Sequence, residues 1–310
     1  MPAIAIGDER FNAIAKKHQR PDGSYNTTRI ARDTGIPRST VQGHVEQPKK
    51  PKPEDKPKFE PTPGWIEGAA VTITSRPDNT FCFLAAGDLH AGSKYCRWDV
   101  REDLYRRAEM RGAQAAFDTG NWIDGEARFN KYDLEVSGMH AQLKNLARRH
   151  PKTKLPIYAV TGDDHEGWYA QREGVDIGGY AEMVMREAGH SWTDLGYMES
   201  HIKLVNANTG KSSILAVIHP GGGSAYALSY RPQKIIESLE GGEKPAVIFM
   251  GHYHKLEAGN ARNVWYVQTG TQSDQTPFMR KKSLEAHVGG ADTARADHDI
   301  ANRGFHQTQT

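Results

Sequence analysis

The sequence predicts an α/β protein in which a small all-α N-terminal domain precedes a large two-sheet α/β sandwich. From Arg10 to Gln47 the apolar residues recur at helical spacing, whereas strand-like and helix-like segments alternate after Trp65. Between these parts, residues 48–64 contain six prolines, several lysines and no apolar period, which predicts an extended, semi-rigid linker. We therefore divide the chain into domains at 1–47 and 65–290, separated by this linker and followed by a polar tail at 291–310.

Three short helices are expected in the N-terminal domain. The last two, at about 27–33 and 37–46, are joined by Thr34-Gly35-Ile36, where glycine can take a positive φ and Pro37 can begin the next helix. This spacing is typical of a helix-turn-helix. Residues 29–41 closely resemble bacterial and phage modules of that kind, whose second helix enters the DNA major groove.

The helix-turn-helix resemblance implies which residues contact DNA. It makes Arg38, Ser39 and Gln42 the candidates for groove contacts. Residues 1–60 contain twelve Lys or Arg against eight Asp or Glu, which favours DNA as a partner. The alternative is a three-helix module for protein interaction or oligomerisation, and Gly43 inside the second helix is a mild objection to DNA recognition.

The large domain begins with strands and helices in alternation and ends with strand after strand. This order suggests two sheets with helices outside them. The expected strands are 71–75, 80–86, 115–119, 156–161, 201–206, 213–218, 246–250 and 264–268, and the expected helices are 99–112, 133–149, 177–188 and 232–239.

Five of the expected strands end in segments rich in glycine, histidine and acidic or amide residues. The carboxyl ends of strands are where an α/β sheet presents its binding crevice, so these side chains are expected to meet. The five segments are Gly87-Asp88-Leu89-His90, Gly120-Asn121-Trp122-Ile123-Asp124-Gly125, Gly162-Asp163-Asp164-His165-Glu166-Gly167, His219-Pro220-Gly221-Gly222 and Gly251-His252-Tyr253-His254.

The order of these segments resembles the calcineurin-like metallophosphoesterases, whose fold is a two-sheet α/β sandwich with two metal ions at the strand ends. The resemblance covers residues 80–271. It implies one metal bound by Asp88, His90 and His254 and another bound by Asp164, His219 and His252, with Asn121 between them. Mixed oxygen and nitrogen ligands favour Mn²⁺, with Fe, Zn²⁺ or Ni²⁺ as alternatives.

Two positions depart from the pattern of that family. The bridging aspartate is replaced by Asn121, and the asparagine before the catalytic histidine is replaced by Asp164. We interpret the pair as an exchange that preserves ligand charge, so that both metals still bind. The rival interpretation is that one site is weak and activity is low or lost.

The same resemblance assigns the proton chemistry. It makes His165 the residue that stabilises the transition state and donates a proton to the leaving oxygen, and it makes Asp124 the residue that orients His165. Glu166 is either a helper behind the ligands or a solvated carboxylate. Nearby aromatic residues could stack on a nucleobase, although packing is the commoner role, and these are Trp122, Trp168 and Tyr169.

Composition restricts the surroundings of the protein. The formal net charge of +2 says little about partners, and the two cysteines, Cys82 and Cys96, form no metal or disulfide pattern. No apolar run is long enough to cross a membrane. We therefore expect a cytoplasmic protein.

The two domains together suggest a nucleic acid phosphodiesterase that reaches DNA through its helix-turn-helix. The arrangement resembles proteins of tailed bacteriophages and their prophages. One alternative is a phosphoesterase acting on a nucleotide or a phosphoprotein. The other is a non-catalytic DNA-binding regulator whose metal site has degenerated at Asn121.

Overall fold

Residues 4–5, 8–45, 69–240 and 244–293 are described by the computed structural model of the chain. The chain divides into two units, Met1–Thr62 and Pro63–Thr310. The linker predicted at 48–64 lies outside the described residues. Within the described ranges, no helix is both long and apolar enough to cross a membrane.

The first unit contains the three helices that the sequence predicts. Its hydrophobic core joins Phe11, Ile30 and Val41, one residue from each helix. Gly35 ends the second helix with a φ of +70°, a left-handed conformation that glycine adopts without strain. The helices are α1 (Glu9–Lys17), α2 (Thr27–Thr34) and α3 (Arg38–His44).

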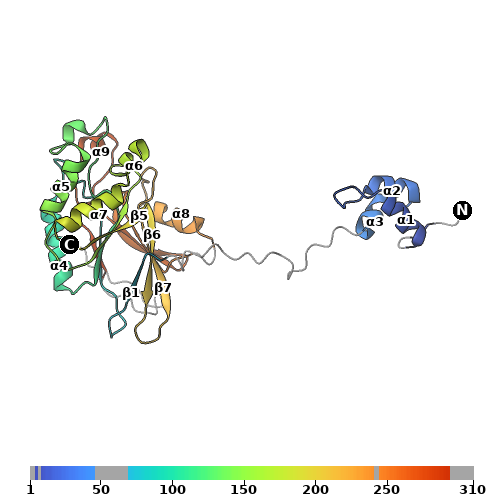
Figure 1. Ribbon diagram of the computed structural model, residues 1–310, viewed down its shortest axis with the longest axis horizontal. Helices are drawn as coiled ribbons and strands as arrows, with labels where there is room; N and C mark the ends of the chain where they lie inside the picture. Colours follow the sequence, from blue (N-terminus) through green and yellow to red (C-terminus); the bar gives the residue numbers. More distant parts are fainter. Residues whose placement is uncertain (1–3, 6–7, 46–68, 241–243, 294–310) are drawn as a thin grey trace. The chain divides into compact units, whose positions relative to one another are not determined.

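The second unit is built on two β-sheets (Figure 1). The six-stranded sheet has the order β1-β6-β7-β8-β10-β9, and its strands are β1 (Val71–Thr74), β6 (Glu199–Val205), β7 (Ser212–Ile218), β8 (Val247–Met250), β10 (Val264–Thr269) and β9 (Leu256–Ala261). The five-stranded sheet has the order β11-β2-β3-β4-β5, and its strands are β11 (Ala291–Thr293), β2 (Phe83–Ala86), β3 (Ala115–Asp118), β4 (Ile157–Thr161) and β5 (Trp192–Tyr197).

Side chains of the two sheets pack against each other to form the central core. Phe83 and Phe117 of the five-stranded sheet share this core with Phe249 of the six-stranded sheet. Along β2, alternate residues face opposite sides, so Leu84 belongs to a second core outside the sheet. Both faces of β2 are therefore buried, which explains why its sequence is continuously apolar.

Helices cover the outer faces of both sheets. The core outside the five-stranded sheet includes residues of α4 (Trp98–Met110), α5 (Met139–Arg149) and α7 (Ile177–Glu187). Ile236 of α8 (Tyr230–Ser238) packs on the outer face of the six-stranded sheet. The short elements are η1 (Lys131–Asp133), α6 (Gly167–Glu173) and α9 (Pro277–Lys281).

The predicted two-sheet α/β sandwich is confirmed, and each of the eight expected strands overlaps a strand of the structure. Several boundaries differ from the prediction by two or more residues, and two of them have a structural reason. The helix expected at 133–149 begins at Met139, because Gly138 has a φ of +91° that is incompatible with a helix. The polar tail was expected to begin at 291, but Ala291–Thr293 form β11, whose backbone pairs antiparallel with β2.

Candidate dinuclear metal centre

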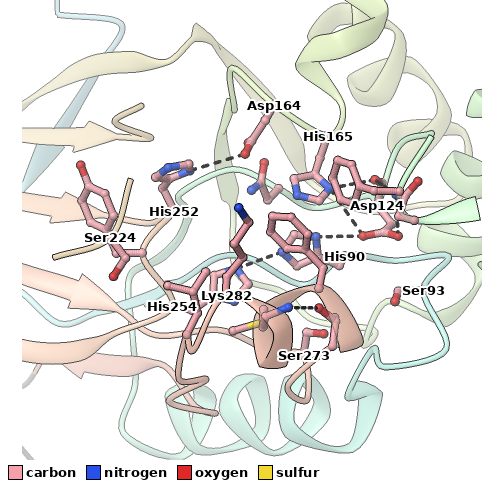
Figure 2. A pocket seen from close by; sticks show the side chains of 18 of the residues that line it. His90, Ser93, Asp124, Asp164, His165, Ser224, His252, His254, Ser273 and Lys282 are labelled. Atoms are coloured by element: carbon pink, nitrogen blue, oxygen red, sulfur yellow. Dashed lines mark hydrogen bonds and ion pairs between the residues drawn. The ribbon is translucent and has the colours of Figure 1, made fainter. Parts of the chain in front are cut away.

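The strands β2, β3, β4, β7 and β8 end at the same edge of the two sheets, and their following loops meet there. A pocket of about 550 Å³ opens at this place. Figure 2 shows that side chains from these separate loops converge on it, among them His90, Asp124, Asp164, His252 and His254. The fold therefore brings together residues that lie up to 164 positions apart in the sequence.

The first cluster consists of Asp88, His90 and His254, whose ligand atoms all lie within 4.8 Å of one another. His254 Nε2 lies 3.3 Å from Asp88 Oδ1 and 3.1 Å from His90 Nε2. Two imidazole nitrogens that face each other beside a buried carboxylate are arranged as ligands of a cation.

The second cluster consists of Asp163, Asp164, His219 and His252. The Asp164 carboxylate lies between the two histidines, with Oδ1 3.4 Å from His219 Nε2 and Oδ2 3.6 Å from His252 Nδ1. The sequence predicts Asp164 as a metal ligand but not Asp163. The repeated aspartate after Gly162 was the available signal, because either residue could have occupied the ligand position.

Hydrogen bonds to the nitrogen that faces away from the cluster orient three of the histidines. His219 Nδ1 donates to the backbone oxygen of Thr119 at 2.6 Å, and His252 Nε2 donates to that of Gly222 at 2.7 Å. His90 Nδ1 donates to Asp124 Oδ1 at 3.1 Å. In each case the nitrogen that faces the cluster has a free lone pair, as a metal ligand requires.

Several buried polar atoms of the centre have no hydrogen-bond partner within the described residues. Around the second cluster these atoms include Asn121 Oδ1, Asp164 Oδ1, His219 Nε2 and His252 Nδ1. An unpaired buried polar atom is costly unless another group satisfies it. Four such atoms around the second cluster fit a divalent cation, and the two clusters together fit two cations.

Asn121 contacts the first cluster and lies near the second. Its Nδ2 donates to Asp88 Oδ1 at 3.4 Å. A Cβ placed on Gly162 would lie 2.6 Å from Asn121 Oδ1 and 3.1 Å from His219 Nε2, so these two atoms border the same small space. The residue therefore lies where the bridging ligand was expected.

Glu166 holds the loops of the centre in place. The side chain is fully buried, and its Oε1 accepts hydrogen bonds from the backbone nitrogens of Asn121 and Gly162, both at 2.8 Å. Burial raises the pKa of Glu166 to about 8. The residue is therefore a positioning group behind the ligands, and the alternative of a solvated carboxylate is wrong.

His165 forms a third group with His90 and Asp124. His165 Nδ1 donates to the backbone oxygen of Asp124 at 2.8 Å and lies 3.5 Å from its carboxylate. Burial opposes protonation, but the negative charges of Asp164 and Asp124 raise the pKa of His165 to about 10. The two carboxylates therefore favour the imidazolium form, which can donate a proton from Nε2.

No family model matches the sequence, and no curated protein matches it. Several solved structures resemble the chain. A novel archaeal phosphodiesterase has 10% identity and a TM-score of 0.39, and covers 74% of this chain and 99% of its own. The phosphoesterase YfcE from E. coli has 14% identity and a TM-score of 0.40, with coverages of 74% and 98%. Wild-type Vps29 from Entamoeba histolytica, complexed with Zn²⁺, has 13% identity and a TM-score of 0.37, with coverages of 74% and 97%. Because these identities and TM-scores are low, the chemistry of this chain is argued only from its own site residues.

Six residues of the centre have a left-handed backbone conformation that is uncommon outside glycine. Their φ angles lie between +50° and +75°. Each such residue costs about 1–3 kcal/mol and persists only where its surroundings hold it, which is typical of functional sites. The six residues are Asp88, His90, Asn121, His165, His252 and His254.

The remaining predicted residues lie in different surroundings. Arg38, Ser39 and Gln42 are exposed on α3 of the first unit. Trp122 and Tyr169 are buried in the core outside the five-stranded sheet, so they cannot stack on a ligand. Trp168, by contrast, lines the pocket, and its ring stacks on that of His165 with centroids 4.8 Å apart.

Many pocket residues were not predicted from the sequence, and three of them are large side chains beside the ligand clusters. Phe129, Phe278 and Lys282 line the pocket, although each lies outside the five strand-end segments. An isolated phenylalanine or lysine has no sequence signal for such a role. Only the folded chain shows that these side chains lie beside the metal clusters.

Proposed function

We propose that the second unit is a dinuclear metallophosphoesterase and that the chain acts as a nucleic acid phosphodiesterase brought to DNA by α2 and α3. The observation that supports the enzyme is the pair of adjacent ligand clusters, with His165 held beside them by Asp124. Structural ion pairs also perturb pKa values, so the proposal rests on the geometry of the two clusters.

The clusters would hold two divalent cations, which would act as Lewis acids on the oxygens of a phosphate ester. Their oxygen and nitrogen donors suit Mn²⁺, Fe, Zn²⁺ or Ni²⁺ better than Ca²⁺. The chain itself would supply the proton for the leaving oxygen from His165, and Asp124 would fix the orientation of both His165 and His90.

The proposal that DNA is the substrate or target rests on the first unit. Arg38, Ser39 and Gln42 are exposed together on α3, while Val41 on the opposite side is buried. A helix that presents polar side chains in this way can enter a major groove. Because the two units belong to one chain, DNA bound by the first would be concentrated near the second.

Two alternatives each have an observation in their favour. The pocket volume of about 550 Å³ suits a small phosphate ester, such as a nucleotide, as well as one residue of a longer chain. Asn121 provides a neutral oxygen where a carboxylate would bind cations more strongly, which favours a degenerate site in a non-catalytic DNA-binding regulator.

A hydrolysis assay with Mn²⁺ tests the proposal. It compares bis-p-nitrophenyl phosphate, p-nitrophenyl phosphate, single-stranded DNA and double-stranded DNA. We expect diester cleavage, reduced about 10²–10⁴-fold in His165→Ala because the general acid is lost. Asp88→Ala should also lose activity, whereas His140→Ala on the exposed part of α5 should not. Preference for the monoester would favour the small-substrate alternative, and no turnover would favour the regulator.

A further inference from the structure

An aromatic wall extends from the two ligand clusters along one side of the pocket. It consists of Trp168, Phe129 and Phe278, which all line the pocket. Trp168 stacks on His165 and meets the ring of Phe129 edge-on, with centroids 5.8 Å apart. Phe129 in turn stacks on Phe278, with centroids 4.8 Å apart and an interplanar angle of 29°.

The two phenylalanines of this wall are unusually exposed. Phe129 is 49% exposed and Phe278 is 39% exposed. Every other phenylalanine that the structure describes is 3% exposed or less. A phenylalanine kept at the surface of a pocket loses the free energy of burial unless a ligand covers it.

The helix α9 places a cation beside the same wall. Phe278 lies in α9, and Lys282, four residues later, lines the pocket as well. Residues four positions apart lie on one side of a helix. The ammonium group of Lys282 has no ion pair or side-chain hydrogen bond within the described ranges, so it is available to an anionic ligand. Glu285, which also lines the pocket, is already paired with Lys255 at 2.6 Å.

We propose that the aromatic wall is a subsite for one unstacked nucleobase of a nucleotide whose phosphate lies at the metal clusters. This inference rests on the proposed phosphoesterase function and specifies its substrate. Bases stack on aromatic side chains without regard to sequence, and polar residues such as Asp133 and Ser224 line the same pocket and can bond the edge of a base. A paired base in a duplex has no free face, so the substrate is a single-stranded or terminal nucleotide.

A binding measurement tests the subsite without relying on turnover. Titration calorimetry on the full chain with Mn²⁺ compares thymidine 5′-monophosphate with deoxyribose 5-phosphate, which lacks the base. We expect the nucleotide to bind at least about tenfold more tightly, as stacking on one aromatic group provides. In Phe129→Leu and Phe278→Leu the ratio of the affinity for the nucleotide to that for deoxyribose 5-phosphate should fall towards one. The affinity for deoxyribose 5-phosphate itself should stay unchanged.

A control variant and a third ligand complete the test. Tyr226→Leu changes a fully exposed aromatic residue that does not line the pocket and should keep the wild-type ratio. Equal affinity of the wild type for both ligands would overturn the subsite while leaving the phosphoesterase intact. Tighter binding of O-phosphotyrosine than of the nucleotide would also overturn it. If neither phosphate binds and no diester is cleaved, the proposed function itself fails.

Discussion

At the scale of single residues, the most informative position is Asp164. Its carboxylate lies between His219 and His252, and the neighbouring Asp163 belongs to the same cluster. Two carboxylates beside Asn121 can supply the charge that a bridging aspartate would otherwise provide. Despite burial, which opposes ionisation, the nearby histidines and His165 in particular hold the pKa of Asp164 well below its usual range. The group is therefore ionised and able to bind a cation.

We expect the wild-type chain to bind two equivalents of Mn²⁺ and Asp164→Asn to bind only one tightly. The substitution removes the charge between His219 and His252 and leaves the first cluster intact. Equilibrium dialysis with metal analysis gives the stoichiometry. Asp103→Asn, on the exposed side of α4, is the control. Fewer than two equivalents in the wild type at saturating Mn²⁺ would contradict the exchange of charge between Asn121 and Asp164.

At the scale of elements, the close approach of strand-end loops requires glycine. Gly251 follows β8, and a Cβ there would lie 2.7 Å from Asp88 Oδ2 and 2.8 Å from the backbone oxygen of Thr119. Neither neighbour can move easily, because Asp88 is fully buried and the other contact is to backbone.

Gly251→Ala should therefore lower the free energy of unfolding by about 1–3 kcal/mol and weaken Mn²⁺ binding, since the new methyl group separates β8 from Asp88. Gly223→Ala is the matched control in a neighbouring loop, because its Cβ would meet only a side-chain atom of Arg231 at 3.9 Å. Urea denaturation and metal titration measure the two effects. Equal stability of the two variants would show that the loops can separate freely.

In the helix α3, by contrast, one glycine is not required by close neighbours. Gly43 lies inside α3, where a Cβ would meet nothing within 4 Å. Gly43→Ala should stabilise this helix by about 1 kcal/mol, because alanine has the higher helix propensity. Gly35→Ala, at a φ of +70°, should destabilise the same region by a similar amount. Hydrogen exchange of the α3 amides in the full chain should slow in the first variant and accelerate in the second.

The sequence predicts elements and site residues unequally well, for physical reasons. Strands buried on both faces, such as β2 and β8, are continuous apolar runs and were found. The strand β5 contains Asp194 and Gly196, and β9 contains Gly259 and Asn260, so neither has a strand pattern. The strand β11 has only three residues.

Site residues also differ in how well the sequence predicts them. Those directly after strands could be predicted, because topology alone brings strand ends together. The aromatic wall could not be predicted, since Phe129 and Phe278 are 149 positions apart and meet only through the packing of loops and α9. The role of Glu166 also depends on the fold, because its partners are backbone nitrogens of two separate loops.

At the scale of the whole molecule, the two units would bind different forms of a nucleic acid. The first would contact a duplex through α3, whereas the pocket of the second would accept one unstacked nucleotide. Both modes of binding are compatible if the chain binds duplex DNA at one place and acts on an end or a single-stranded segment of the same DNA molecule. Covalent linkage would then raise the rate on such a substrate without any contact between the units.

The proposed role of the first unit predicts DNA binding that depends on salt. If α2 and α3 neutralise about four phosphates, affinity of the full chain for duplex DNA should fall about a hundredfold from roughly 50 to 200 mM salt. Fluorescence anisotropy measures this slope. Arg38→Ala should weaken binding, and Arg20→Ala, which changes an exposed arginine outside α3, should have less effect. Binding that is absent or insensitive to salt would instead favour a module for protein interaction or oligomerisation, because burial of apolar and neutral surface releases no counterions.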